Sequence, residues 1–177
     1  MTIHWFPDNT VLCNFASIGQ IDLLEQILNG RGRWVEAIAQ EVRRSSVYLP
    51  DLAKVEAGGW LGEPIEIDEI SEIDTIERVR RSVFGGLEGQ PTKHLGEAQT
   101  CHVVRSWPQF SGSFWVTDDG EALRYARYQG LHARETVDLI SEGVAFGVVS
   151  RQIGFGHLKA MLTAGRHLRV PINASHL

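Results

Sequence analysis

The residues of this chain that could do chemistry are acidic side chains placed where predicted strands end. Asp8 follows a short predicted strand at residues 3–6, and Asp118 and Asp119 follow a stronger one at residues 113–117. In a parallel α/β sheet, ligands bind beyond the carboxyl ends of the strands. We therefore expect these carboxylates to lie at the same edge of the sheet.

Two glutamates on predicted helices could reach the same cleft. Glu41 lies on the second turn of a helix that begins near residue 36, and Glu97 lies in the first turn of a helix at residues 94–104. Crowded carboxylates repel one another, and a hard cation removes that repulsion. Mg²⁺ binds a few carboxylates together with substrate phosphate, and two such ions can promote phosphodiester cleavage. The acidic set therefore points to metal-dependent cleavage of a phosphodiester.

The same acidic residues also have ordinary structural explanations. Asp8 and Asp119 could each cap the helix that follows it. Glu97 could stabilise the start of its helix through the helix dipole, and Glu41 could be a solvated surface residue. The chain has 22 acidic residues, so their positions alone do not decide between a metal site and these roles.

The composition is that of an ordinary globular protein. The chain has 177 residues, 43% hydrophobic and 22% charged, which suits one compact domain and excludes disordered and fibrous classes. Its formal net charge of −5 lacks the basic excess of a protein that binds nucleic acid by charge alone. A nuclease is not excluded, because bound metal ions change the sign of a local acidic cluster.

The sequence predicts a cytoplasmic protein with no membrane segment. Its beginning has no basic start and no apolar stretch of signal-peptide length, and no run reaches the roughly 20 apolar residues of a membrane span. Cys13 and Cys101 each lie among apolar neighbours and show no CxxC spacing. This favours reduced, buried thiols over a disulfide, a catalytic thiol or a zinc site.

The elements that must position the acidic residues alternate between short strands and helices, as in an α/β fold. Weaker strand signals lie at residues 32–35, 65–67 and 131–133. Apolar spacing predicts helices at residues 10–18, 21–28, 36–42, 70–79, 94–104, 121–128, 135–141 and 150–164. We expect one domain over residues 1–177, a three-layer α/β/α sandwich with a mainly parallel central sheet. A less regular insertion or lid lies at about 46–92.

Three short motifs follow one another along the chain. They are Asp8-Asn9-Thr10-Val11-Leu12, then Leu95-Gly96-Glu97-Ala98, then Val116-Thr117-Asp118-Asp119-Gly120-Glu121-Ala122. Together they resemble the PIN-domain family, and within it the prokaryotic PIN-like proteins related to VapC toxins. In such proteins the first strand ends in an acid, a later helix begins with Gly-Glu and a late strand ends in Asp or Asp-Asp. The resemblance covers nearly the whole chain and is weakest between about 46 and 92.

The resemblance implies a metal-dependent endoribonuclease, often the toxin of a type II toxin–antitoxin pair and usually a homodimer. Its substrate would be RNA and its protein partner an antitoxin. Asp8, Glu41, Glu97 and Asp118 match the catalytic acids. The implied ligands of Mg²⁺ or Mn²⁺ are Asp8, Glu97 and Asp118, with Asp119 as an additional one. Thr10 matches the small polar position that supports the first acid.

Two departures from the family pattern bear on how a substrate would be positioned. The order Asp-Asn-Thr differs from the common Asp-Thr-Asn. Many relatives also carry an arginine five residues after the first aspartate of the late pair, and that position here is Leu123, followed by Arg124. Two other functions stay open: a catalytically silent PIN-like module that binds RNA or protein, and a structure-specific DNA nuclease.

Other residues could contact a nucleic acid. The basic groups are Arg43 with Arg44, and Arg78 with Arg80 and Arg81, which either bind phosphates or form a solvated charged face. Trp60 lies in the irregular region and could stack on a base, contact a partner or belong to the core.

Overall fold

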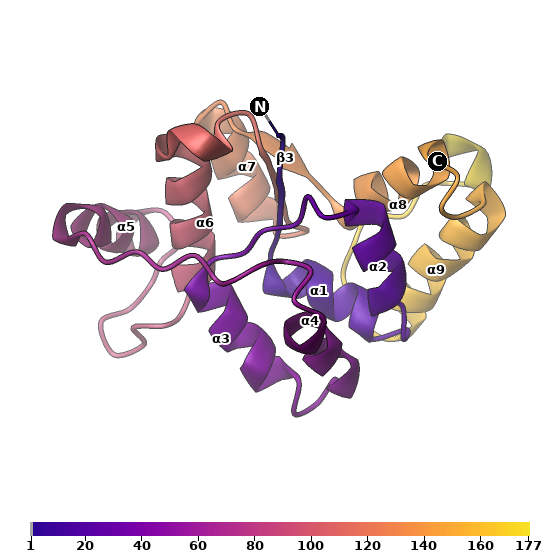
Figure 1. The fold of residues 1–177 in the computed structure, drawn as a ribbon, viewed down its shortest axis with the longest axis horizontal. Helices are drawn as coiled ribbons and strands as arrows, with labels where there is room; N and C mark the ends of the chain where they lie inside the picture. The colour runs from indigo at the N-terminus through magenta and orange to yellow at the C-terminus, as the bar shows by residue number, and fades with distance from the viewer. Residues whose placement is uncertain (1) are drawn as a thin grey trace.

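A short parallel β-sheet lies at the centre of the fold (Figure 1). The structure is a computed structural model and describes residues 2–177. The three strands, in sheet order, are β1 (Trp5–Pro7), β2 (Phe114–Val116) and β3 (His132–Arg134). Phe6 pairs with Trp115, which pairs in turn with Ala133, and both pairings are parallel. The predicted α/β class and parallel sheet are confirmed.

Two of the weaker strand signals form only single bridges. Trp5 bridges to Gly32, and Val35 bridges to Ile65, both in the parallel sense. The expectation of full strands at 32–35 and 65–67 is therefore wrong. The pairing stops because α3 (Glu36–Ser45) begins directly after Val35, which turns the chain away from an extended path.

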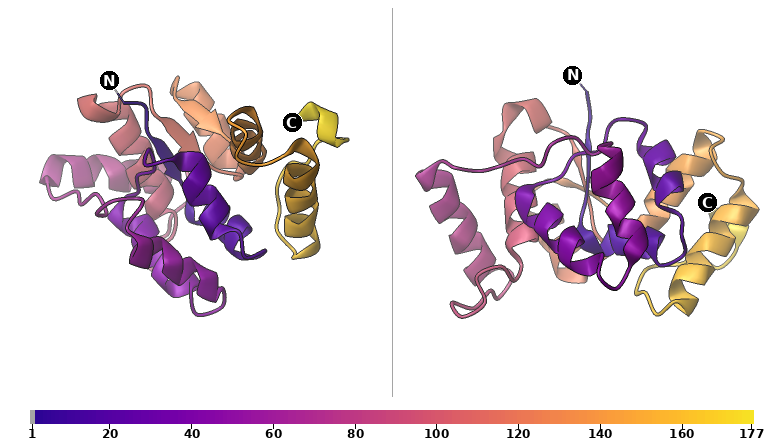
Figure 2. Two further views of the ribbon diagram at one scale, coloured as in Figure 1. Left: turned by 45° about the vertical axis from the view of Figure 1, so that its right-hand side comes forward. Right: turned by 60° about the horizontal axis from the view of Figure 1, so that its bottom comes forward.

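Within residues 2–177, nine α-helices surround the sheet. Besides α3 they are α1 (Asn9–Ala16), α2 (Ile21–Leu28), α4 (Ala53–Gly58), α5 (Ile70–Ser82), α6 (Leu95–Ser106), α7 (Gly120–Tyr128), α8 (Thr136–Ala145) and α9 (Arg151–Thr163). Each helix predicted from apolar spacing is present, and α4 was not predicted. Figures 1 and 2 show α5 and α9 at opposite ends of the molecule.

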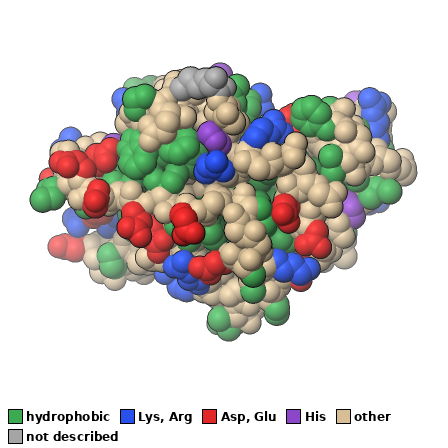
Figure 3. All heavy atoms as spheres, viewed as in Figure 1, with side chains coloured by type: hydrophobic (Ala, Val, Ile, Leu, Met, Phe, Trp, Pro, Cys, Tyr) green, Lys and Arg blue, Asp and Glu red, His purple; other side chains and the backbone are tan. Residues whose placement is uncertain are grey.

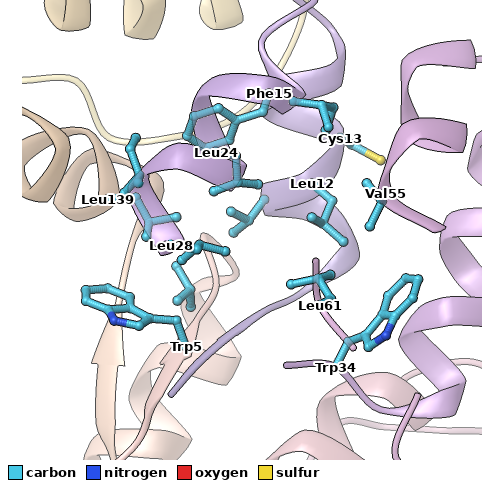
Figure 4. Packing of buried hydrophobic residues seen from close by; sticks show 14 of the residues in the cluster. Trp5, Leu12, Cys13, Phe15, Leu24, Leu28, Trp34, Val55, Leu61 and Leu139 are labelled. Carbon is cyan, nitrogen blue, oxygen red and sulfur yellow. The ribbon is translucent and has the colours of Figure 1, made fainter. Parts of the chain in front are cut away.

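The two faces of the sheet are covered by separate apolar clusters. On one face, Trp115 is fully buried together with residues of α5, α6 and α7. On the other, Val116 belongs to a larger cluster around α1, α2 and α3, part of which Figure 4 shows. Successive residues of a strand point to opposite faces, so these neighbours in β2 anchor both layers.

The region at about 46–92 contributes to both clusters. Leu52, Val55 and Leu61 are fully buried in the larger cluster, and Ile76 and Phe84 in the smaller one. Their burial ties this region to the sheet layers. Trp60 is half-buried against the larger cluster, which favours a core role for it.

The two cysteines are buried and unpaired, as predicted. None of the helices in the described part of the chain is long and apolar enough to cross a membrane.

One basic residue of the predicted charged groups is not on the surface. Arg80 is 1% exposed, and its guanidinium donates to the Glu77 carboxylate at 2.6 and 2.7 Å. It also donates to the backbone carbonyls of Gln90 (3.1 Å) and Lys93 (3.2 Å). The expectation that Arg80 binds phosphate or lies on a solvated face is therefore wrong, because this side chain holds the loop after α5.

We expect Arg80→Ala to lower the free energy of unfolding by about 2 kcal/mol, since it removes a buried guanidinium and leaves two loop carbonyls and the Glu77 carboxylate without their donor. The matched control is Arg81→Ala, because Arg81 also pairs with Glu77 but is exposed. The control should change stability by less than about 0.5 kcal/mol. Urea unfolding followed by tryptophan fluorescence measures both, and equal losses would contradict the structural role of Arg80.

Candidate functional site

The carboxyl ends of the three strands place polar groups side by side. The backbone N–H of Asp8 donates to the Val116 carbonyl at 2.9 Å, and that of Thr117 donates to the Arg134 carbonyl at 2.9 Å. The sheet pairing thus continues one residue beyond β1 and β2. Asp8 is itself the last paired residue after β1, and Asp118 directly follows Thr117, the last paired residue after β2. Asp8 and Asp118 are therefore fixed at one edge of the sheet.

Asp8 is buried, with 4% of its surface exposed, and it caps α1 by accepting a 2.8 Å hydrogen bond from the Val11 backbone N–H. Burial raises the pKa of Asp8 to about 8, despite hydrogen bonds from Thr117 and Val11 that lower it. The charges of Asp118 and Glu97 raise this pKa further. Asp8 therefore does cap α1, but the hydrogen bond that it gains does not offset the cost of burying a charged carboxylate.

Asp118 is held by groups from two helices. One carboxylate oxygen accepts from the Thr136 backbone N–H at 3.0 Å, and the other accepts from the Thr136 hydroxyl and, at 2.8 Å, from the Asn14 amide. Both Asn14 and Thr136 are fully buried. Burial raises the pKa of Asp118, which the Thr136 hydrogen bonds lower and the charges of Glu135 and Asp138 raise. These bonds fix the orientation of the carboxylate.

Glu41 and Gly96 meet where α3 packs against the first turn of α6. Burial raises the pKa of Glu41 to about 7, and the charge of Glu97 raises it further. The charge of Arg44 and a hydrogen bond from the Gly96 backbone lower the same pKa. A Cβ atom on Gly96 would lie 2.4 Å from Cδ1 of Ile38 and 3.1 Å from the Glu41 carboxylate. Only glycine lets the two helices approach this closely.

Glu97 interacts with two of the other acids, Asp8 and Glu41. Its charge raises the pKa of both Asp8 and Glu41. Its side chain is 22% exposed and lies 3.3 Å from the His94 ring, a residue that begins α6 in a left-handed conformation (φ 61°). Glu97 therefore interacts by its charge both with Asp8, at the end of β1, and with Glu41, on α3.

The remaining predicted residues lie at the edge of this group. Asp119 is exposed and caps α7, where one of its oxygens accepts from the backbone N–H groups of Glu121 and Ala122 at 2.8 Å each. Thr10 is half-buried in the first turn of α1, and its hydroxyl makes no hydrogen bond within the described residues. The structure brings Asp8 within range of the charges of Asp118 and Glu97, and Glu41 within range of the charge of Glu97. It places Asp119 as a helix cap next to Asp118.

The basic residues near the site differ in the carboxylates with which they interact. Arg43 is exposed and binds Glu36 and Glu56, whereas the neighbouring Arg44 faces Glu41 closely enough to lower its pKa. Arg124 is 73% exposed and lies 3.8 Å from Glu121. A surface ion pair of this kind holds a side chain only weakly.

The donor set suits a hard divalent cation. Its members are carboxylates, and burial together with the charges of neighbouring acids raises the pKa of two of them, Asp8 to about 8 and Glu41 to about 7. Within residues 2–177, no three His, Cys, Asp or Glu side chains lie close enough together to hold a metal ion by themselves. Mg²⁺ keeps several waters and takes few protein ligands, so separated carboxylates suit it better than a closed cage.

Sequence reasoning missed three polar residues at this site: Asn14, Thr136 and Arg166. Thr136 follows β3, so the strand-end argument applied to residues 131–133 would have found it. Asn14 lies in an apolar stretch of α1, and Arg166 lies beyond α9, where its Nε donates to Asn14 at 2.9 Å. No local signal marks either of them, because their contact joins residues 152 positions apart.

Comparisons with protein-family models, with curated proteins and with solved structures found no match for this chain. The function is therefore argued from the chemistry of the site itself.

The raised pKa of Asp8 predicts that the stability of the folded protein depends on pH. Its ordinary value is 3.8, and in the folded protein it is about 8. Between these values the unfolded chain has lost the proton that the folded chain keeps, so stability falls as pH rises from about 4 to about 8 and then levels off. Asp8→Asn keeps a helix-capping side chain and removes the titration.

With chelator present, the free energy of unfolding is compared between Asp8→Asn and the parent at two pH values. The difference in favour of Asp8→Asn should be larger at about pH 9 than at about pH 5 by more than about 1 kcal/mol. This is a low threshold, because a shift of one pKa unit already corresponds to about 1.4 kcal/mol. Urea unfolding at the two pH values measures this. Asp74→Asn, at an exposed position of α5, is the control and should track the parent. If Asp8→Asn tracks it too, Asp8 titrates normally and the description of its environment is wrong.

Proposed function

We propose that this chain is a metal-dependent endoribonuclease with a PIN-like fold, related in its motifs to VapC toxins. One observation carries the proposal: the parallel pairing of β1 and β2 places Asp8 and Asp118 at adjacent strand ends, where their charges interact. Glu97 interacts with Asp8 and with Glu41, so four acids from four parts of the chain share one region. A structural role for each acid alone does not account for their accumulation in a buried place.

Each acid has a distinct task in the proposed reaction. Asp8, Glu97 and Asp118 hold Mg²⁺ or Mn²⁺, with Asp119 as an additional ligand from the start of α7. The bound ion would supply polarisation of the phosphate and activation of a water. Asn14 and Thr136 orient Asp118, as residues behind metal ligands commonly do. Glu41, with a pKa of about 7, accepts a proton from the attacking water at its carboxylate.

RNA as the substrate rests on the motif resemblance, and the electrostatics of the surface limit how it could bind. Figure 3 shows acidic side chains spread over one face of the molecule, with basic ones in small groups between them. Such a surface does not bind nucleic acid by bulk charge, so substrate binding must depend on metal ions and on a few local cations. A toxin role, with an antitoxin partner and a homodimer in the cytoplasm, is part of the same proposal and rests on the resemblance.

Asp8→Asn and Glu97→Gln should each reduce cleavage of single-stranded RNA in Mg²⁺ or Mn²⁺ by more than about 100-fold. Loss of a residue that merely supports a metal ligand already costs about 10–100-fold, and loss of a ligand costs more. Glu25→Gln is the matched control, because Glu25 is an exposed glutamate of α2 with no ion pair among the described residues. Gel analysis of a labelled oligonucleotide measures all four proteins.

Four results would contradict the proposal. Undiminished cleavage by both variants, or cleavage that persists in chelator, would show that the acids do not hold an essential metal. Cleavage of DNA alone, when RNA and DNA are tested side by side, would make the chain a DNA nuclease. Tight RNA binding without cleavage in either metal would make it a silent binding module.

A further inference from the structure

A single amide group connects the acidic site to the C-terminal part of the chain. Asn14, fully buried on α1, donates from its amide nitrogen to the Asp118 carboxylate at 2.8 Å and to the Thr136 hydroxyl at 3.1 Å. Its amide oxygen accepts from Nε of Arg166 at 2.9 Å. Asp118 and Arg166 thus lie at opposite ends of one rigid, planar group.

The rest of the Arg166 guanidinium is not engaged. An arginine has five N–H donors, and within residues 2–177 only Nε of Arg166 makes a hydrogen bond, while no carboxylate forms an ion pair with it. The side chain is half-buried. The hydrogen bond from Nε thus attaches the guanidinium to Asn14 and leaves the donors of its terminal nitrogens free.

The charge of Arg166 acts on the same side of α1 as the acids. Burial raises the pKa of Cys13, next to Asn14; the charge of Arg166 lowers this pKa, and the charges of Asp8 and Glu41 raise it. Figure 1 shows α1 beginning at the end of β1 and running towards the side of the molecule where α9 lies. A positive charge from the chain beyond α9 is thereby placed beside the acidic site.

A purely structural arginine nearby shows what Arg166 lacks. Arg169 binds Glu135 at 3.1 Å and Asp138 at 3.4 Å, and these pairs fasten the C-terminal segment to the start of α8. Arg166 makes no such pair, although acids surround the site. Its free fork of N–H donors has the geometry that binds a phosphate by two parallel hydrogen bonds.

We propose that Arg166 binds a backbone phosphate of the nucleic acid at the acidic site, and that Asn14 is its positioning residue. This inference rests on the proposed nuclease function and deepens it by naming a substrate contact. The proposed phosphate contact would be connected to a proposed metal ligand, because the Asn14 amide is hydrogen-bonded to both Asp118 and Arg166. Arg44 is an exposed residue of α3 that acts on Glu41 by its charge. Among the described residues, Arg44 has no hydrogen-bonded connection to Asp118 of the kind that Asn14 gives Arg166.

The test measures binding in a background that does not cleave. A fluorescein-labelled single-stranded RNA is titrated with Asp8→Asn and with the double variants Asp8→Asn/Arg166→Gln, Asp8→Asn/Arg166→Lys and Asp8→Asn/Arg151→Gln, and anisotropy is read at several salt concentrations. Arg151 is the control, because it is exposed at the start of α9 with no ion pair among the described residues. Circular dichroism melting checks that each variant is folded.

Arg166→Gln should weaken RNA binding by about tenfold and lower the slope of log affinity against log salt by roughly 0.7, the value for one phosphate contact on a single strand. Arg166→Lys should keep the slope and lose part of the affinity, because lysine retains the charge without the fork. Arg151→Gln should match the background. In the cleaving protein, Arg166→Gln should raise KM by a larger factor than it lowers kcat.

Unchanged affinity and salt slope in Arg166→Gln would overturn the inference and make Arg166 a tether for the C-terminal segment. The proposed function would then still stand, provided that Asp8→Asn abolishes cleavage by the parent. No RNA binding by the Asp8→Asn background, together with no cleavage by the parent, would overturn both proposals.

Discussion

The parallel pairing of three very short strands is the constraint on which the site depends. Each strand has only three residues, yet the pairing extends from β1 into Asp8 and from β2 into Thr117. A shift of either strand by one residue would turn Asp8 or Asp118 to the opposite face of the sheet. Trp115 and Val116 resist such a shift, because each fills a separate apolar cluster on its own face. The packing of β2 therefore determines where the acids lie.

The buried acids of the site lower the stability of the folded protein. A buried carboxylate such as that of Asp8 gains from helix capping but loses more from desolvation, as its raised pKa shows. The acids around it add repulsion instead of compensation. Groups that lower stability in this way are retained where function needs them. Under the proposed function, a cation that binds only the folded chain would recover this loss.

The sequence predicts the framework of the site better than its interior. Apolar spacing locates the helices, and the run of β-prone residues before Asp118 locates β2, because these signals are local. The single bridges at Gly32 and Val35 were overestimated as strands, since the sequence does not show how soon α3 starts. Arg80 was assigned to the surface because its partners, loop carbonyls after α5, cannot be recognised before the loop folds. Asn14 and Arg166 are joined only by the tertiary fold.

The most direct test of the account is a crystal structure of the protein soaked in Mn²⁺, with anomalous difference maps that locate the ion. The account predicts a strong peak at the carboxyl ends of β1 and β2, with Asp8, Glu97 and Asp118 as its protein neighbours, and no such peak in Asp8→Asn. Full occupancy of Mn²⁺ elsewhere, with these carboxylates still hydrogen-bonded only to protein groups, would contradict a metal site at the strand ends.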